Sequence, residues 1–313
     1  MTYILRQVVM LFGVLLTLSV LLFVMLAWVP GQAPEMLLMQ GGGAVSGEQI
    51  AELRARLGLD RPVHVQYVEW IGRAIQLDFG RSIRTNRPVS ETLAQVMPHT
   101  IELALASLLI AIVVGVGLGI LAAVYRNTWL DAGSMFLALL GWSIPNFFLG
   151  ILLLLFFAVQ LGWFPITGVG GWDRLILPAA TLGLTTAGLI ARLTRTEILE
   201  QLNLDYVRTA RGKGLWERAV VFRHVLKNSM ISVITVVGLQ FGRLLGGTVI
   251  VETVFARQGV GRVAVDALLA RDLPLIQGSV LLLAAVFVVT NLVVDLAYGY
   301  LDPRIRVANQ GAS

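Results

Sequence analysis

The sequence contains no cysteine and little charge. Zero Cys in 313 residues excludes disulfides, thiolate catalysis, Cys-ligated zinc and iron–sulfur clusters, and it leaves the redox compartment undetermined. Charged residues make up 14% of the chain, compared with about 25% in soluble domains. Hydrophobic residues make up 57% of the chain. Their combined apolar surface is larger than a soluble globule of this size can bury. The composition excludes an ordinary soluble enzyme, a disordered chain and a disulfide-stapled module, and it predicts an integral membrane protein.

Lysine is also scarce, since the chain has only Lys213 and Lys227. A phosphate-binding P-loop needs a lysine followed by Ser or Thr, and neither lysine meets that requirement. Three histidines are scattered and none has a zinc-like partner four residues on: His64, His99 and His224. No Ser/His/acid pattern stands out. The sequence therefore predicts a chain that is not an enzyme and binds no metal or cofactor, so any energy for pumping must come from an ion gradient or another subunit.

Charge-free stretches locate the membrane spans, because an ionised side chain at the bilayer centre costs roughly 2.5–3.5 kcal/mol. A helix needs about 20 apolar residues to cross the hydrocarbon. The stretches are continuous apolar runs without the alternation of a lipid-facing strand, so helices are expected. The prediction is an all-α protein with six transmembrane helices, near residues 8–29, 102–124, 134–160, 175–193, 230–251 and 278–300.

The distribution of cations predicts the orientation, because Lys and Arg are enriched on the cytoplasmic side. The segment between the fourth and fifth spans is rich in them: Arg195, Arg208, Arg211, Lys213, Arg218, Arg223 and Lys227. Both termini are then expected in the cytoplasm. The predicted organisation is a first span within 1–30, an extracytoplasmic segment 31–98, a five-span core 99–300 with a cytoplasmic loop 194–229, and a tail 301–313.

The extracytoplasmic segment 31–98 has the patterns of two amphipathic helices. Ser46 precedes one, which is expected to end at Gly58. Apolar residues at helical spacing from Val65 to Ile75 predict the other, with Tyr67 and Trp70 suited to the membrane interface. The segment is either a cap over the outer mouth of the protein or a docking face for an external partner.

Few charges lie inside the predicted spans. Arg243 sits near the centre of span five and Asp295 in the inner half of span six, while Glu102 and Arg192 lie at span ends. Arg243 is the costly residue and should avoid lipid. It either meets an anionic group of a passing substrate or pairs with a neighbouring helix. Three small residues at the middle of span two predict close helix packing rather than a dinucleotide site: Gly115, Gly117 and Gly119.

The loop from Asp205 to Met230 is the most informative stretch. Asp205 is expected to cap a short helix at residues 206–211, and Gly212 and Gly214 to end it. A second helix over residues 215–228 then leads into span five. Composition alone would fit a basic segment on anionic lipid.

This segment resembles the cytoplasmic signature of binding-protein-dependent ABC importer permeases, Glu-Ala-Ala-x3-Gly followed by a second helix. Gly214 matches the glycine and Ala210 the second alanine. Arg208 and Thr209 replace the Glu and first Ala, as is typical of the peptide/nickel branch, whose form looks like D-Y-V-R-T-A-R-x-K-G. Agreement extends to residues 3–6, 30–31, 77–82, 161–163, 246–247, 252–255, 259–261 and 301–304.

The resemblance implies a type I importer fold and a bacterial inner-membrane location. It implies that the chain is the first of two permease subunits forming a translocation path for di- or oligopeptides, with glutathione or nickel as alternative cargoes. Two cytoplasmic ATPase subunits would bind ATP and Mg²⁺, and an extracytoplasmic binding protein would deliver the substrate. A secondary carrier driven by an ion gradient is the main alternative. Neither nucleic acid nor a cofactor on this chain is expected.

The resemblance also implies that the loop couples the permease to the ATPases. The expected coupling residues are Asp205, Tyr206, Arg208, Thr209, Ala210, Arg211 and Gly214. In this hypothesis Ala210 and Gly214 allow close approach, Tyr206 anchors the contact, and the arginines flank it. Arg243 is the candidate for the translocation path.

Overall fold

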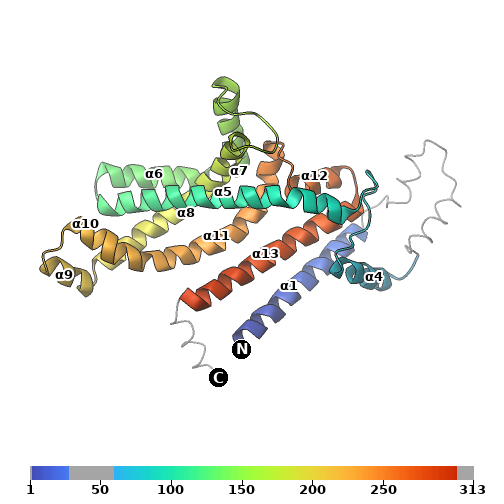
Figure 1. Cartoon of the computed structure of the whole chain (residues 1–313), viewed down its shortest axis with the longest axis horizontal. Helices are drawn as coiled ribbons and strands as arrows, with labels where there is room; N and C mark the ends of the chain where they lie inside the picture. Colours follow the sequence, from blue (N-terminus) through green and yellow to red (C-terminus); the bar gives the residue numbers. More distant parts are fainter. Residues whose placement is uncertain (1, 28–59, 302–313) are drawn as a thin grey trace. The chain divides into compact units, whose positions relative to one another are not determined.

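The structure, a computed structural model, describes residues 2–27 and 60–301, and every regular element within them is a helix (Figure 1). The elements are α1 (Thr2–Ala27), α4 (Val63–Ile75), α5 (Val89–Val124), α6 (Trp129–Ser143), α7 (Asn146–Leu153), the π-helical η1 (Leu154–Gln160), α8 (Asp173–Leu202), α9 (Asp205–Gly212), α10 (Glu217–Ala219), the π-helical η2 (Val220–Val225), α11 (Leu226–Val254), α12 (Val260–Leu269) and α13 (Leu273–Leu301).

Four of these helices are long and apolar enough to cross a membrane. They are α5, α8, the continuous η2–α11 helix and α13, and the pair formed by α6 and α7–η1 makes a fifth if it counts as one span. In α1, residues Val9–Met25 form a shorter apolar helix. The described residues thus provide four to five candidate spans, compared with the six predicted, and the first predicted span, 8–29, overlaps α1 within the described residues.

The third predicted span, 134–160, is not one straight helix. It is broken between Ser143 and Asn146, where the two halves meet at 107°. Pro145 explains the break, because a proline disfavours the helical conformation of the residue before it. Ile144 accordingly adopts φ −81° and ψ 126°, which is extended backbone. Hydropathy over residues 134–160 gives no sign of this break, so the prediction of one uninterrupted span was wrong.

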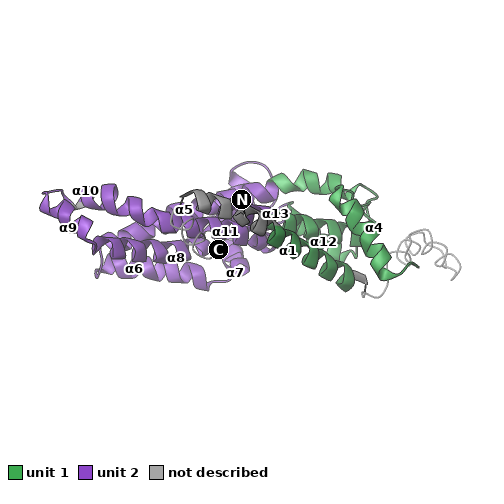
Figure 2. Cartoon of the chain, turned by 90° about the horizontal axis from the view of Figure 1, so that it is seen from below, with its two compact units in different colours: residues 1–98, 258–288 green, residues 99–257, 289–313 purple. Residues whose placement is uncertain are grey.

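The chain divides into two compact units, residues 1–98 with 258–288 and residues 99–257 with 289–313 (Figure 2). In the second unit α8 is the central helix, in contact with α6, α7 and α11. Small residues let α5 lie against α8: a Cβ on Gly115 would stand 2.8 Å from the Ala187 carbonyl oxygen, and one on Gly119 2.7 Å from that of Ala191. Close packing is confirmed for these two glycines, whereas Gly117 faces open space.

In the first unit, α4 confirms the predicted helix over residues 65–75. Trp70 is buried against α1, its ring 5.7 Å from that of Phe23. The Tyr67 hydroxyl hydrogen-bonds that of Ser19 at 2.8 Å. Aromatic rings supply a large apolar area, and α1 offers a partner for it. The helix expected to end at Gly58 lies outside the described residues.

Candidate functional site

The short helix α9 carries most of the predicted site. It begins at Asp205, one residue earlier than expected, and Leu204 occupies the N-cap position without a side-chain cap. The expectation that Asp205 caps this helix is therefore wrong. Asp205 is instead the first helical residue, and its negative carboxylate interacts favourably with the positive end of the helix dipole. The carboxylate also accepts a hydrogen bond from Arg208 at 3.4 Å.

The C-terminal end of α9 is a Schellman motif centred on Gly214. The Leu215 amide donates to the Ala210 carbonyl at 3.4 Å and the Gly214 amide to the Arg211 carbonyl at 2.9 Å. Gly214 has φ +80°, a conformation that glycine adopts without the penalty of a Cβ. The prediction that the glycines end this helix is confirmed, and Gly214 is the residue that reverses the chain.

The inner face of α9 packs against the rest of the second unit. Val207 is fully buried and Ala210 is 7% exposed, so the small size of Ala210 serves packing within this subunit. Both belong to one apolar cluster with residues of α5, α8 and η2: Ala123, Ile198, Val220 and Val225. Burial of these side chains on four elements fixes α9 to the ends of the long helices.

The outer face of α9 is polar and accessible. Arg208, Thr209 and Arg211 are exposed. Tyr206 is half-buried, and its hydroxyl donates to the Gln201 side-chain oxygen at 2.7 Å. Two apolar side chains follow Gly214 on the surface, and Trp216 is 81% exposed. Sequence reasoning missed Trp216, since a single aromatic in a basic loop has no periodic pattern.

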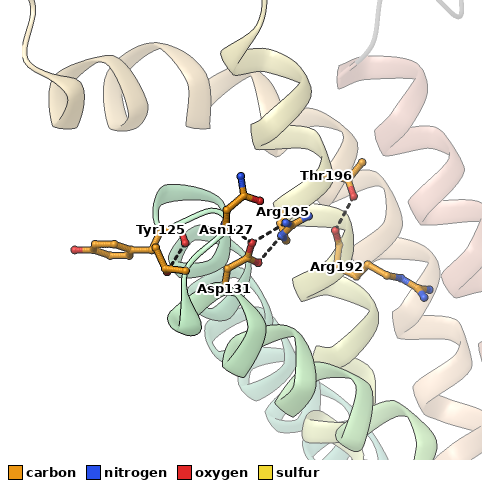
Figure 3. Close-up of polar contacts among 7 residues, drawn as sticks. Tyr125, Asn127, Asp131, Arg192, Arg195 and Thr196 are labelled. Atoms are coloured by element: carbon orange, nitrogen blue, oxygen red, sulfur yellow. Dashed lines mark hydrogen bonds and ion pairs between the residues drawn. The ribbon is translucent and has the colours of Figure 1, made fainter.

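An ion pair joins α6 to α8 near the same end of the bundle (Figure 3). The Arg195 guanidinium donates from Nε to Asp131 Oδ1 at 2.7 Å and from Nη2 to Oδ2 at 2.8 Å. The backbone N–H of Asn127 also donates to Asp131 Oδ2, at 3.0 Å. Asp131 is 5% exposed and Arg195 is half-buried, and a bidentate pair of this kind orients both partners. Nothing in the sequence pairs these residues, which lie 64 positions apart.

A cleft of about 300 Å³ lies beside this ion pair. Most of the residues that line it are polar or charged, and the last of them lies two residues before α9: Arg126, Asn127, Arg195, Thr196, Leu199, Glu200 and Asn203. The surface next to α9 is therefore hollowed and offers charges of both signs to a partner.

Arg243 lies on α11 with an exposed side chain. Among the described residues no hydrogen bond or ion pair engages it, while the side chain of Asp295 lies outside the description. Arg192 has a different environment, with its guanidinium 4.8 Å from the ring centroid of Trp142. The structure thus does not bring Arg243 together with the residues of α9.

A buried polar cluster that the sequence reasoning missed connects α5 to α11. The Thr100 hydroxyl donates to the Glu252 carboxylate at 2.7 Å, with both side chains fully buried. Arg257, 1% exposed, forms an ion pair with Glu102. Glu252 lies just beyond the predicted fifth span, 230–251, so the hydropathy pattern gave no reason to expect that it is buried. In the described part of the chain no three His, Cys, Asp or Glu side chains gather as a metal site would require.

Long apolar helices that fix a short basic helix at one end of their bundle define a class, the multi-pass helical membrane proteins. Two family models match the sequence. Residues 115–307 match the "Binding-protein-dependent transport system inner membrane component" and residues 1–104 its N-terminal companion. The chain belongs to this family of bacterial inner-membrane ABC transporter permeases.

Curated relatives agree over nearly the whole length. A putative peptide transport system permease protein of Brucella abortus is 44% identical over 311 residues, 97% of this chain and 98% of the relative. The glutathione transport system permease protein GsiC of Salmonella typhimurium is 44% identical over 306 residues, 98% of this chain and 99% of the relative. The chain is thus a member of the branch that contains peptide and glutathione permeases.

Solved structures share the fold. The MetNI methionine ABC transporter in an inward-facing conformation matches with a TM-score of 0.59 at 18% identity, over 67% of this chain and 96% of that one. An amino acid ABC transporter matches with a TM-score of 0.54 at 13% identity, over 69% and 94%. The expected importer-permease fold is thereby supported by geometry as well as by sequence.

Proposed function

We propose that this chain is one permease subunit of an ATP-driven importer and that α9 is the helix through which ATPase subunits move it. One observation carries this proposal: the outer face of α9 is exposed and basic, while its inner face is buried in an apolar cluster shared with α5, α8 and η2. A force applied to α9 is then transmitted to the long helices, because a packed element moves as a rigid body.

In this function the permease supplies the path and its partners supply the energy. The chain crosses the membrane six times with both termini in the cytoplasm, α1 being the first span. A second permease subunit completes the path, two cytoplasmic ATPases hold ATP and Mg²⁺, and an extracytoplasmic binding protein delivers the substrate. This chain binds no cofactor. Arg208, Thr209 and Arg211 contact the ATPase, Asp205 and Tyr206 support that face, and Trp216 provides an apolar anchor.

The proposed cargo is a di- or oligopeptide. The Brucella abortus relative named as a putative peptide permease supports it, and the glutathione permease of Salmonella typhimurium supports the related alternative, since glutathione is itself a small peptide. Nickel is the third candidate, on branch resemblance alone. Uptake by the assembled transporter of labelled dipeptide, glutathione and Ni²⁺ in parallel separates the three.

A cysteine cross-link tests the coupling proposal directly, because the native chain has no cysteine. Arg208→Cys places a single thiol on the outer face of α9, and Trp172→Cys is the matched control, being 81% exposed before α8. With a cysteine introduced into the ATPase groove, we expect a disulfide with position 208 and none with position 172. Equal cross-linking at both positions, or none at 208 in an assembled complex, contradicts the proposal.

A further inference from the structure

The loop at residues 80–88, just before α5, presents a group of exposed cations. Arg81, Arg84 and Arg87 all have exposed side chains. Arg81 donates to the Asn86 carbonyl at 2.8 Å, and Arg87 pairs with Glu91 at 3.1 Å. Among the described residues, no ion pair engages the guanidinium of Arg84. The loop thus concentrates positive charge, of which Arg84 is the most available.

The backbone of this Arg loop is folded back on itself. The Ser82 amide donates to the Arg87 carbonyl at 3.0 Å, the Asn86 amide to the Ser82 carbonyl at 2.9 Å, and the Val89 amide to the Gly80 carbonyl at 3.0 Å. These bonds close a tight turn, so the arginines are held on one short, defined protrusion rather than on a flexible linker.

A buried carboxylate anchors the same loop. Asp272, 2% exposed, accepts hydrogen bonds from the Ser82 hydroxyl, from the Ile83 amide at 3.1 Å and from the Arg84 amide at 3.4 Å. It also accepts from the Leu275 amide at 3.4 Å, at the start of α13. A buried charge is retained where its hydrogen bonds are satisfied. Asp272 therefore fixes the backbone of the Arg loop to the start of α13.

We propose that the Arg loop is a docking surface for an acidic patch of the extracytoplasmic substrate-binding protein. This inference rests on the proposed function, which puts residues 31–98 outside. The positive-inside bias gives no reason for arginines there. Exposed cations raise the association rate with an acidic partner and fix its register, and a loop whose backbone is fixed in advance loses little entropy on binding. Arg81 and Arg84 make the contact, and Asp272 positions them.

The experiment uses the whole transporter in nanodiscs, with both permeases and both ATPases, titrated with its binding protein while ATP hydrolysis is measured. The variants are Arg84→Glu and the double variant Arg81→Glu/Arg84→Glu. Arg73→Glu is the matched control, because it is exposed in the last turn of α4 and makes the same charge change.

For the double variant we expect the half-saturating concentration of binding protein to rise about tenfold at low salt and about twofold at high salt, with maximal hydrolysis unchanged. Arg73→Glu should change this concentration by less than about twofold.

An unchanged half-saturating concentration in the double variant overturns the docking surface while leaving the proposed function intact. An effect that vanishes in nanodiscs without phosphatidylglycerol overturns it in favour of lipid headgroups. A wild-type complex that the binding protein does not stimulate overturns both proposals.

Discussion

At the scale of single residues, Gly214 and the Asp131–Arg195 ion pair stabilise the region around α9 in different ways. Gly214 supplies a left-handed backbone at the turn, and the Asp131–Arg195 pair ties α6 to α8 nearby. A Cβ at Gly214 would meet no atom within 4 Å, so its importance in this subunit is conformational rather than steric. The Asp131–Arg195 pair contributes electrostatically, because each charge neutralises and hydrogen-bonds the other.

Gly214→Ala should weaken coupling. A non-glycine residue in the left-handed region costs roughly 1–2 kcal/mol, which loosens the end of α9. Gly212→Ala is the control, since Gly212 is helical with no atom within 4 Å of a Cβ. We expect a lower ratio of transport to ATP hydrolysis for Gly214→Ala only, with normal membrane insertion. The same ratio in both variants would refute a conformational role for Gly214.

Asp131→Ala should destabilise the subunit by about 2 kcal/mol, because it leaves a partly buried guanidinium without its carboxylate. Glu91→Ala provides the comparison, as it breaks an ion pair whose side chains are about half exposed and should cost about 0.5 kcal/mol or less. Thermal unfolding of the two purified variants measures the difference. Equal melting temperatures would show that the buried pair contributes no more than a surface one.

At the scale of elements, the sequence predicted what periodicity and charge record. Charge-free runs found the long helices α5, α8, α11 and α13, and glycine punctuation found the end of α9. The sequence analysis did not predict the break at Pro145, because hydropathy carries no information about backbone geometry. It also missed the Asp131–Arg195 and Glu102–Arg257 pairs, since contacts across 64 and 155 positions depend on how the helices pack.

The outer face of α9 gives a prediction at this scale. Arg208→Glu reverses one exposed charge of the face proposed to contact the ATPase, and we expect the affinity of the ATPase for the permease to fall about tenfold at low salt. Arg223→Glu, an exposed position on η2, should leave it within about twofold. Pull-down of the ATPase over a salt series measures both, and equal losses would show that overall charge, rather than α9, governs binding.

At the scale of the whole molecule, a mid-span cation has to avoid lipid. Arg243 is exposed on this subunit, and such a residue in a membrane protein faces a water-filled path or a partner. We expect Arg243→Gln to fold with an unchanged melting temperature and to alter the rate or the preference of transport among peptides. A lower melting temperature of the isolated subunit, with transport preference unchanged, would instead make Arg243 a structural brace.

The most direct test of the account is uptake into proteoliposomes. The complete transporter, with binding protein outside and ATP inside, should accumulate labelled peptide, and vesicles holding this chain alone should accumulate none under a proton or sodium gradient. Accumulation by the lone chain would contradict the central claim that this subunit provides a path and takes its energy from partners through α9.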